Sequence, residues 1–223
     1  FTNIGHRVVL GLMLGDTESE ESWTAFFSWL KQRGLRGVAL VVSDDHGGLV
    51  RSIRAQWQGA TWQRCQTHFM RNILGLKDEI HTHVRAILEA PDPETARMLL
   101  QQTLAAYEDK AAKAMRFDDA TAVLSLPEKY RKRLRTTNSV ERLNEEVRRR
   151  ERVIRIFPNR ESVIRLIGAL LMEQDEKWAA GRKYLEMAEY LDVVKTGQKR
   201  LPKSLESCNP FSLREFTHKF GLD

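Results

Sequence analysis

A near-continuous apolar run at residues 37–42, GVALVV, constrains the fold of this chain more than any other segment. A strand that is apolar at every position is buried on both faces, as in a parallel sheet covered by helices. Residues 18–33 before it have apolar side chains at the spacing of one helix face, and Gly34 is a suitable helix stop. Residues 7–14 resemble another buried strand. The order strand, helix, strand predicts an α/β core.

Polar residues follow the run at 37–42 directly, as the hexapeptide SDDHGG at residues 43–48. Open α/β sheets place their chemistry at the carboxyl ends of their strands. Asp44 is therefore a candidate functional residue. The alternative is that it is an ordinary turn or helix-cap residue, since Asp is common in both roles.

The chain then changes from a mixed to an all-helical pattern. Residues 49–57 predict a helix, and residues 60–65 predict a short strand that leads into a helix from about His68. From residue 77 to residue 132 the pattern is helical throughout. We expect this segment to be an all-helical insertion in the α/β core.

Two further helices are predicted after this change in pattern. Asp92 and Pro93 have the N-cap and first-turn chemistry that opens a helix, and the pattern continues through about Met115. A second amphipathic helix is predicted at residues 160–187. Its inward residues would be Val163, Leu166, Ile167, Leu170, Leu171 and Trp178. The tail after Lys195 is basic and is predicted to be mostly loop.

The segment 136–159, TTNSVERLNEEVRRRERVIRIFPN, combines one acidic residue with many arginines. Asn138 with Glu141 three positions later is typical of a helix N-terminus. The helical spacing predicts that Val140, Leu143 and Val147 face a core. Glu141 is then either a metal-binding carboxylate or simply the acid of a capping box, and the pattern alone leaves both open.

The net charge is concentrated around this segment. Residues 129–155 contain eleven Lys and Arg against four Glu. Their net charge of +7 exceeds the +6 of the whole chain. Such a cluster favours a polyanionic partner, although a solvated charged helix is the common alternative. Successive arginines point in different directions on a helix, so some would pair with Glu145 or Glu146 and others would contact phosphate. The candidate DNA-contacting residues are Arg142, Arg148, Arg149, Arg150 and Arg152.

Cys65 and His68 form a C-x-x-H pair within the sequence WQRCQTHFMRN at residues 62–72. A zinc site normally needs four ligands, and Cys208 with His218 is a poor second pair. The favoured interpretation is a buried thiol and a histidine that forms a hydrogen bond or contacts phosphate. Two cysteines make no disulfide framework, and no apolar run is long enough to cross a bilayer. We therefore expect a cytosolic protein without a membrane partner.

Three ordered blocks of this sequence resemble the Mutator-type transposases of bacterial insertion sequences. They are VVSDDHGGL at residues 41–49, ATWQRCQTHFMRN at residues 60–72, and the segment 136–159. The flanking segments 8–16 and 166–184 are similar to the family as well. The resemblance therefore covers nearly the whole chain.

The resemblance implies an RNase H-like mixed sheet interrupted by a helical insertion, with the N-terminal strands missing. It implies a DDE-type enzyme in which Asp, Asp and Glu hold two Mg²⁺ or Mn²⁺ ions. Such an enzyme activates water to nick DNA at the ends of the element, and the freed 3′-hydroxyl then attacks target DNA and joins the strands. The second Asp falls on Asp44 and the Glu on Glu141. Asp45 falls where the family commonly has a small residue, so it is not expected to be a ligand.

Other expectations also follow from the resemblance. The C-x-x-H signature falls on Cys65 and His68, followed by Arg71 and Asn72, and has no derived role. The expected segments are a partial catalytic core at 1–76, the insertion at 77–135, core helices with a basic surface at 136–195, and a basic tail at 196–223. The partners would be element ends and target DNA, with a homo-oligomer pairing the two ends. The location would be the bacterial cytoplasm, associated with the nucleoid.

One part of the family pattern has no match in this sequence. The first catalytic Asp belongs on a strand upstream of residues 8–14, and Asp16 follows that segment in the wrong context. Together with the start at Phe1, this favours the C-terminal portion of a transposase, from a truncated gene or a partial reading frame. We then expect little strand transfer by the chain alone. The alternatives are a non-catalytic DNA-binding or assembly remnant and a related RNase H-like nuclease.

Overall fold

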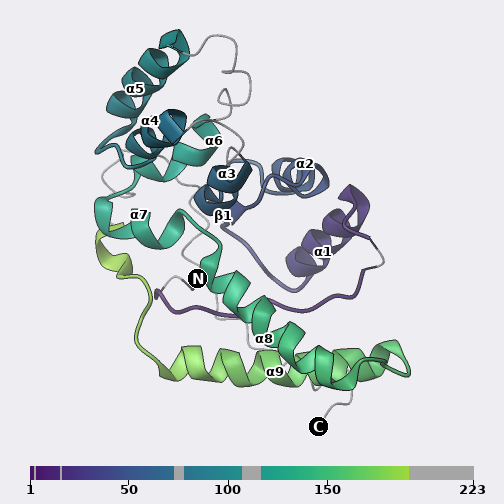
Figure 1. Ribbon diagram of the computed structural model, residues 1–223. Helices are drawn as coiled ribbons and strands as arrows, with labels where there is room; N and C mark the ends of the chain where they lie inside the picture. Colours follow the sequence, from purple (N-terminus) through teal and green to yellow (C-terminus); the bar gives the residue numbers. More distant parts are fainter. Residues whose placement is uncertain (3, 16, 73–77, 107–116, 191–223) are drawn as a thin grey trace. The chain divides into compact units, whose positions relative to one another are not determined.

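The computed structural model describes residues 1–2, 4–15, 17–72, 78–106 and 117–190 (Figure 1). The chain divides into two compact units. Unit 1 comprises Phe1–Ala39 and Glu141–Asp223, and unit 2 comprises Leu40–Val140. The described residues are mostly helical and include a small parallel sheet, so the predicted α/β class holds in this general form. None of the helices in these ranges is both long and apolar enough to cross a bilayer.

Unit 2 is built on a strand–helix–strand motif. Strand β1 (Leu40–Ser43) pairs in parallel with β2 (Thr61–Arg64). Helix α2 (Gly47–Gln56), labelled with β1 in Figure 1, connects the two strands. A parallel pair needs such a crossover, because the chain must return to the same end of the sheet. The predicted strands at 37–42 and 60–65 and the helix at 49–57 are confirmed, with their bounds shifted by a few residues.

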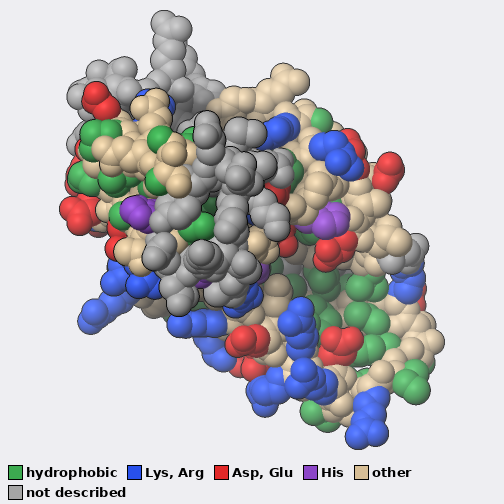
Figure 2. Space-filling model, turned by 45° about the horizontal axis from the view of Figure 1, so that its top comes forward, with side chains coloured by type: hydrophobic (Ala, Val, Ile, Leu, Met, Phe, Trp, Pro, Cys, Tyr) green, Lys and Arg blue, Asp and Glu red, His purple; other side chains and the backbone are tan. Residues whose placement is uncertain are grey.

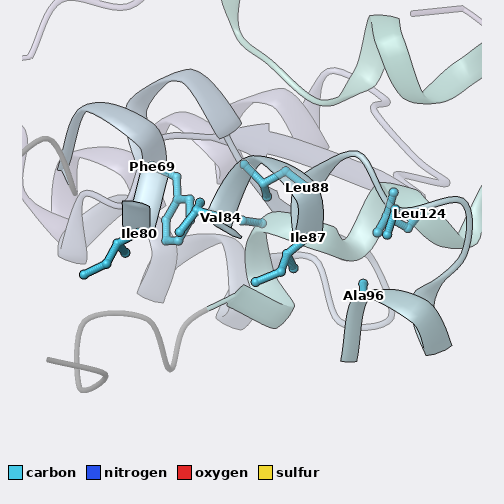
Figure 3. Packing of buried hydrophobic residues seen from close by; sticks show 9 residues of the cluster. Phe69, Ile80, Val84, Ile87, Leu88, Ala96 and Leu124 are labelled. Atoms are coloured by element: carbon cyan, nitrogen blue, oxygen red, sulfur yellow. The ribbon is translucent and has the colours of Figure 1, made fainter. Parts of the chain in front are cut away.

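The helices that follow β2 complete the described part of unit 2, and most of them contribute to one apolar cluster. They are α3 (Gln66–Asn72), α4 (Asp78–Leu88), α5 (Pro93–Ala106), α6 (Phe117–Thr121), the 3-10 turn η2 (Ala122–Ser125) and α7 (Glu128–Leu134). Phe69 of α3 meets Ile80, Val84 and Ile87 of α4 in this cluster (Figure 3). The α4 residues recur at intervals of three and four, which places them on one helix face.

A buried glutamine joins this helical part to the sheet. The Gln63 side chain of β2 is fully buried, and its amide nitrogen donates to the carbonyl oxygens of Arg64 and Ala120 at 2.6 and 2.7 Å. Its amide oxygen accepts from the Val123 backbone N–H at 2.8 Å. Both ends of the amide are therefore satisfied, as burial of a polar group requires.

The predicted start of the helix at Asp92 is confirmed. The Asp92 carboxylate accepts hydrogen bonds from the Thr95 backbone N–H at 2.8 Å and from the Thr95 hydroxyl at 2.7 Å. These bonds, the N–H bond first, hold the pKa of Asp92 below its usual value. Pro93 is the first residue of α5, where its missing N–H costs nothing. The described part of α5 ends at Ala106, so the predicted extension to Met115 lies outside the described residues.

Unit 1 contains α1 (Glu20–Gln32), α9 (Arg160–Ala180) and most of α8 (Asn138–Ile154), whose first three residues belong to unit 2. Its apolar cluster includes the residues that were predicted to face inward on α9, except Leu170, which is buried outside the cluster. Val9, Ile167 and Leu171 are buried in this cluster, and Trp29 of α1 and Leu143 of α8 pack against it. The predicted helix stop at Gly34 is confirmed, since Gly34 has a φ of +100° and its N–H donates to the Lys31 carbonyl at 3.0 Å.

Three sequence-based predictions about unit 1 and its border need correction. Residues 7–14 form no strand, although their apolar pattern suggested one. The Val9 backbone N–H donates to the Asp175 carboxylate of α9 at 2.7 Å, so a side chain takes the place of a ladder partner. Helix α9 ends at Ala180, before the predicted Met187. Val140 was predicted to face a core, but its side chain is 53% exposed.

The segment before Val9 packs on the end of α9 instead of in a sheet. The guanidinium of Arg7 lies between the rings of Trp178 and Tyr184, 4.6 Å from each centroid. The Gly5 carbonyl accepts from the backbone N–H groups of Tyr184 and Leu185 at 2.9 and 3.1 Å. Cation–π contacts and backbone hydrogen bonds therefore fix the start of the chain on unit 1.

Replacement of Gly5 by Ala should destabilise unit 1 more than the same change at Gly34. Both glycines have positive φ, but a Cβ at Gly5 would lie 1.8 Å from the Leu185 carbonyl oxygen, whereas Gly34 has open space. The backbone conformation alone costs an Ala about 1–2 kcal/mol, and the clash adds roughly 1–3 kcal/mol at Gly5. Urea unfolding of the two variants measures the difference. Equal losses of stability would show that the close approach at Gly5 does not matter.

Candidate functional site

The exposed side chain of Asp44 lies at the carboxyl end of β1, as the sequence predicted. The backbone that carries it is fixed from both sides. The Trp62 indole N–H of β2 donates to the Ser43 hydroxyl at 2.9 Å, and this hydroxyl donates to the Asp44 carbonyl at 2.8 Å. Among the described residues, the Asp44 carboxylate has no hydrogen bond or ion pair. Its oxygens are therefore available to a ligand.

The strand register places Cys65 at the same edge of the sheet as Asp44. Ser43 is opposite Arg64, and the Cys65 N–H donates to the Ser43 carbonyl at 2.7 Å. The carboxyl ends of parallel strands meet at one edge, which is where α/β proteins bind ligands. The register thus brings two of the sequence-predicted site positions together.

Asp45 has a different environment from its neighbour. Its carboxylate pairs with the Arg64 guanidinium at 3.3 Å, and the two side chains are only 14% and 7% exposed. The same guanidinium lies 4.9 Å from the centre of the Phe69 ring. Asp45 therefore supports the fold at this edge, which agrees with the expectation that it is not a metal ligand.

The Cys65 side chain is completely buried and contacts the chain just before α8. Its sulfur accepts hydrogen bonds from the Thr137 backbone N–H at 3.4 Å and from the Thr137 hydroxyl at 3.3 Å. A ring nitrogen of His68 lies within 4.8 Å of this sulfur. Cys65 thus matches the buried-thiol interpretation of the C-x-x-H pair, with His68 half-buried beside it. Arg71 and Asn72 are exposed at the end of α3.

Further bonds hold the start of α8 on α3. The Gln66 N–H donates to the Arg135 carbonyl at 3.0 Å, and the Thr67 hydroxyl donates to the Asn138 side-chain oxygen at 3.3 Å. Asn138 is the first residue of α8, and Glu141 lies in the first helical turn. An acidic side chain is favoured there because the helix N-terminus carries a partial positive charge. The helix that carries Glu141 is therefore held at its first residue, Asn138, one turn before Glu141.

The predicted arginine surface lies along α8. Arg142, Arg148, Arg149, Arg150 and Arg152 are all exposed. Arg149 and Arg150 bind the Glu146 carboxylate at 2.7 and 3.1 Å, which confirms the predicted pairing within the helix. The hydrogen bonds, above all those from Arg149, lower the pKa of Glu146 to about 2. Glu146 is therefore ionised at neutral pH and offsets part of the positive charge.

The other three arginines of this surface have no acidic partner within the described ranges. They are Arg142, Arg148 and Arg152. Figure 2 shows Lys and Arg side chains, with Asp and Glu among them, in the lower part of the view, the region of α8 and α9. Exposed guanidinium groups with no acidic partner can bind phosphate groups, for which Arg has suitable donor geometry.

Sequence reasoning missed the residues that hold this site together. Thr137 contacts Cys65 across 72 positions, and no local pattern signals such a contact. The pairing of Asp45 with Arg64 follows from the strand register, which the sequence does not give directly. One usable signal was Gln63, a polar residue on a predicted strand. A polar side chain that is buried there needs hydrogen-bond partners from elsewhere in the chain.

Substitution of the adjacent carboxylates should separate their roles. Asp45→Asn removes the charge that balances the nearly buried Arg64, so we expect a loss of roughly 3–5 kcal/mol in unfolding free energy. Asp44→Asn changes an exposed group and should alter stability by less than about 0.5 kcal/mol. Thermal and urea unfolding of both variants test this. Similar stability of the two would show that the Asp45–Arg64 pair is not structural.

Comparison with known proteins places this geometry in context. The family model described as "Transposase, Mutator family" matches residues 2–181. The chain is 43% identical over 197 residues to the transposase for insertion sequence element IS256 in transposon Tn4001 of Staphylococcus aureus, covering 82% of this chain and 50% of that protein. It is 41% identical over 191 residues to the transposase for IS1081 of Mycobacterium tuberculosis, covering 81% of this chain and 46% of that protein.

A more distant relative is matched over a longer stretch. The chain is 27% identical over 223 residues to a probable insertion-sequence transposase of Corynebacterium diphtheriae, covering 92% of this chain and 65% of that protein. The chain spans about half the length of the more similar relatives. The family model nevertheless covers most of this chain, including Asp44, Cys65 and Glu141. The chain belongs to the Mutator family of transposases.

Proposed function

We propose that this chain contributes metal-binding and DNA-binding residues to an insertion-sequence transposase, an enzyme that cuts and joins DNA strands. The observation that carries the proposal is the exposed Asp44 carboxylate, which has no partner among the described residues, at the carboxyl edge of the sheet. It occurs in a member of a transposase family, in the position where α/β folds bind ligands.

Asp44 and Glu141 are the proposed metal ligands. Carboxylate oxygens are hard donors that suit Mg²⁺ or Mn²⁺, and the exposed Asp44 fits this role. The ions, two in a complete site, would supply an activated oxygen nucleophile and stabilisation of the leaving oxygen. Within the chain, the Trp62–Ser43 bonds orient the backbone at Asp44. The Cys65–Thr137 bonds orient the start of the helix that carries Glu141.

The remaining parts of the proposal rest on the family resemblance. It implies an RNase H-like core, a helical insertion at residues 77–135 and a DDE triad. The resemblance assigns two members of that triad, the second Asp and the Glu, to Asp44 and Glu141. Strand transfer by the complete protein, oligomerisation to pair two element ends, and action at the bacterial nucleoid belong to the same proposal.

The exposed arginines of α8 are the proposed phosphate contacts. Arg142, Arg148 and Arg152 have no acidic partner within the described ranges, so their charge is available to DNA. Contacts to phosphate position a protein on a duplex but read no sequence. This part of the proposal therefore concerns affinity and orientation, with no statement about which element ends are recognised.

Loss of either proposed ligand should weaken metal binding. Titration of the chain with Mn²⁺, followed by the electron paramagnetic resonance signal of the free ion, gives the affinity. Asp44→Asn and Glu141→Gln should each reduce it by at least the roughly 10- to 100-fold typical of losing an outer-shell partner. Glu145→Gln, an exposed acid on the same helix, is the matched control and should leave affinity unchanged. Equal affinity in all four proteins would remove both residues from the metal site.

DNA binding by the arginine surface should depend steeply on salt. The logarithm of affinity for a 30-base-pair duplex, plotted against the logarithm of salt concentration, gives a slope set by the phosphates that the protein contacts. Arg148→Ala and Arg152→Ala should each reduce this slope by about 1. Arg97→Ala, at an exposed position on α5, should not. A flat salt response of the unmodified chain would show that the arginines form only a solvated surface.

The second candidate function is a non-catalytic DNA-binding or assembly protein derived from a transposase. The observation that favours it is the set of exposed arginines on α8, three of which have no acidic partner within the described ranges. The two experiments separate the candidates. Salt-dependent DNA binding without Mn²⁺ binding supports the second, whereas Mn²⁺ binding that needs Asp44 and Glu141 supports the first.

A further inference from the structure

The end of α8 exposes apolar side chains to an unusual extent. Val153 is 81% exposed, Ile154 is 42% exposed, and Ile156, just beyond the helix, is 83% exposed. Single exposed apolar residues are common on protein surfaces. Several exposed apolar residues together instead indicate an interaction site. We refer to Val153, Ile154 and Ile156 with the exposed Arg152 and Arg155 as the α8 tip.

The backbone presents Ile156 at the point where the helix ends. Arg155 has a φ of +60°, and its N–H still donates to the Glu151 carbonyl at 3.0 Å. The Ile156 N–H then donates to the Ile154 carbonyl at 2.7 Å, which closes a tight turn. This left-handed position at a helix end is usually occupied by Gly. Arg155 instead places a charged side chain where the backbone conformation favours a residue without one. The turn thus presents an exposed isoleucine next in sequence to the exposed Arg155.

We propose that the α8 tip inserts an apolar side chain, Ile156 or Val153, between base pairs of duplex DNA from the minor groove. Proteins that kink DNA combine arginines on the phosphates or in the groove with Ile, Leu, Phe or Met wedges that unstack one base step. The α8 tip contains both parts within five residues of chain. The inference rests on the proposed function, because it requires that α8 contacts DNA.

Charge decides between DNA and a second copy of this chain as the occupant. Residues 148–155 contain five arginines and one glutamate. Two copies meeting at this tip would bring like charges together, which opposes association. Duplex DNA presents phosphates on both sides of a groove and an apolar base stack within it, so it complements the arginines and the isoleucines at once.

Fluorescence of 2-aminopurine tests the proposal. The probe is a 30-base-pair duplex of alternating TA steps, with several adenines replaced by 2-aminopurine, so that every binding register reports. Such steps unstack readily. Saturation with the unmodified chain should raise the emission about two-fold, because an inserted side chain unstacks the base. V153S/I156S should lose more than half of this rise but keep the salt slope of DNA binding.

Matched variants and a second measurement keep the outcomes distinct. Met98→Ser removes another apolar side chain that is 51% exposed, on α5, and should change nothing. Circular dichroism verifies that V153S/I156S is folded, and sedimentation velocity gives its oligomeric state.

Salt-dependent binding with no rise in emission overturns the wedge but leaves the proposed function standing. A flat salt response overturns the DNA-binding part of the proposed function and the wedge with it. A dimer that only V153S/I156S converts to monomer, with emission unchanged, identifies a second copy as the occupant and overturns the inference.

Discussion

The parallel pairing of β1 and β2 is the interaction on which the arrangement of unit 2 depends. It aligns Ser43 with Arg64, so the residues that follow, Asp44 and Cys65, leave the sheet at the same edge. Every later contact at that edge starts from this register. Asp45 reaches Arg64, and Cys65 reaches Thr137. A shift of the register by one residue would turn each of these side chains to the opposite face of the sheet.

Adjacent acidic residues have opposite roles because of this register. One carboxylate is neutralised by a nearly buried guanidinium and stabilises the fold, while the other is exposed. A buried charge needs its partner, since desolvation of an unpaired ion costs several kcal/mol. The fold thus binds Asp45 internally and presents Asp44 to solvent, an asymmetry that is required if Asp44 is to bind a ligand.

The sequence predicted the strands and helices whose stabilising contacts are local. The run at residues 37–42, the Asp92 cap and the inward face of α9 were all found from local sequence patterns. Residues 7–14 were wrongly predicted as a strand because a strand also needs a neighbouring strand, which an apolar pattern cannot supply; Val9 bonds to Asp175 instead. The positions of Asp44 and Glu141 were predicted, whereas the Thr137–Cys65 contact was not, because it depends on tertiary structure.

The bonds between Cys65 and Thr137, and between Gln66 and Arg135, have a consequence for the segment that they enclose. They bring its two ends together at one place, although Cys65 and Thr137 are 72 positions apart. A segment with adjacent ends behaves as a side branch of the chain, as inserted domains do. Additions to or deletions from the outer loops of this branch need not displace Asp44 or the start of α8. Evolution can therefore remodel the helical branch for new partners while the edge of the sheet keeps its chemistry.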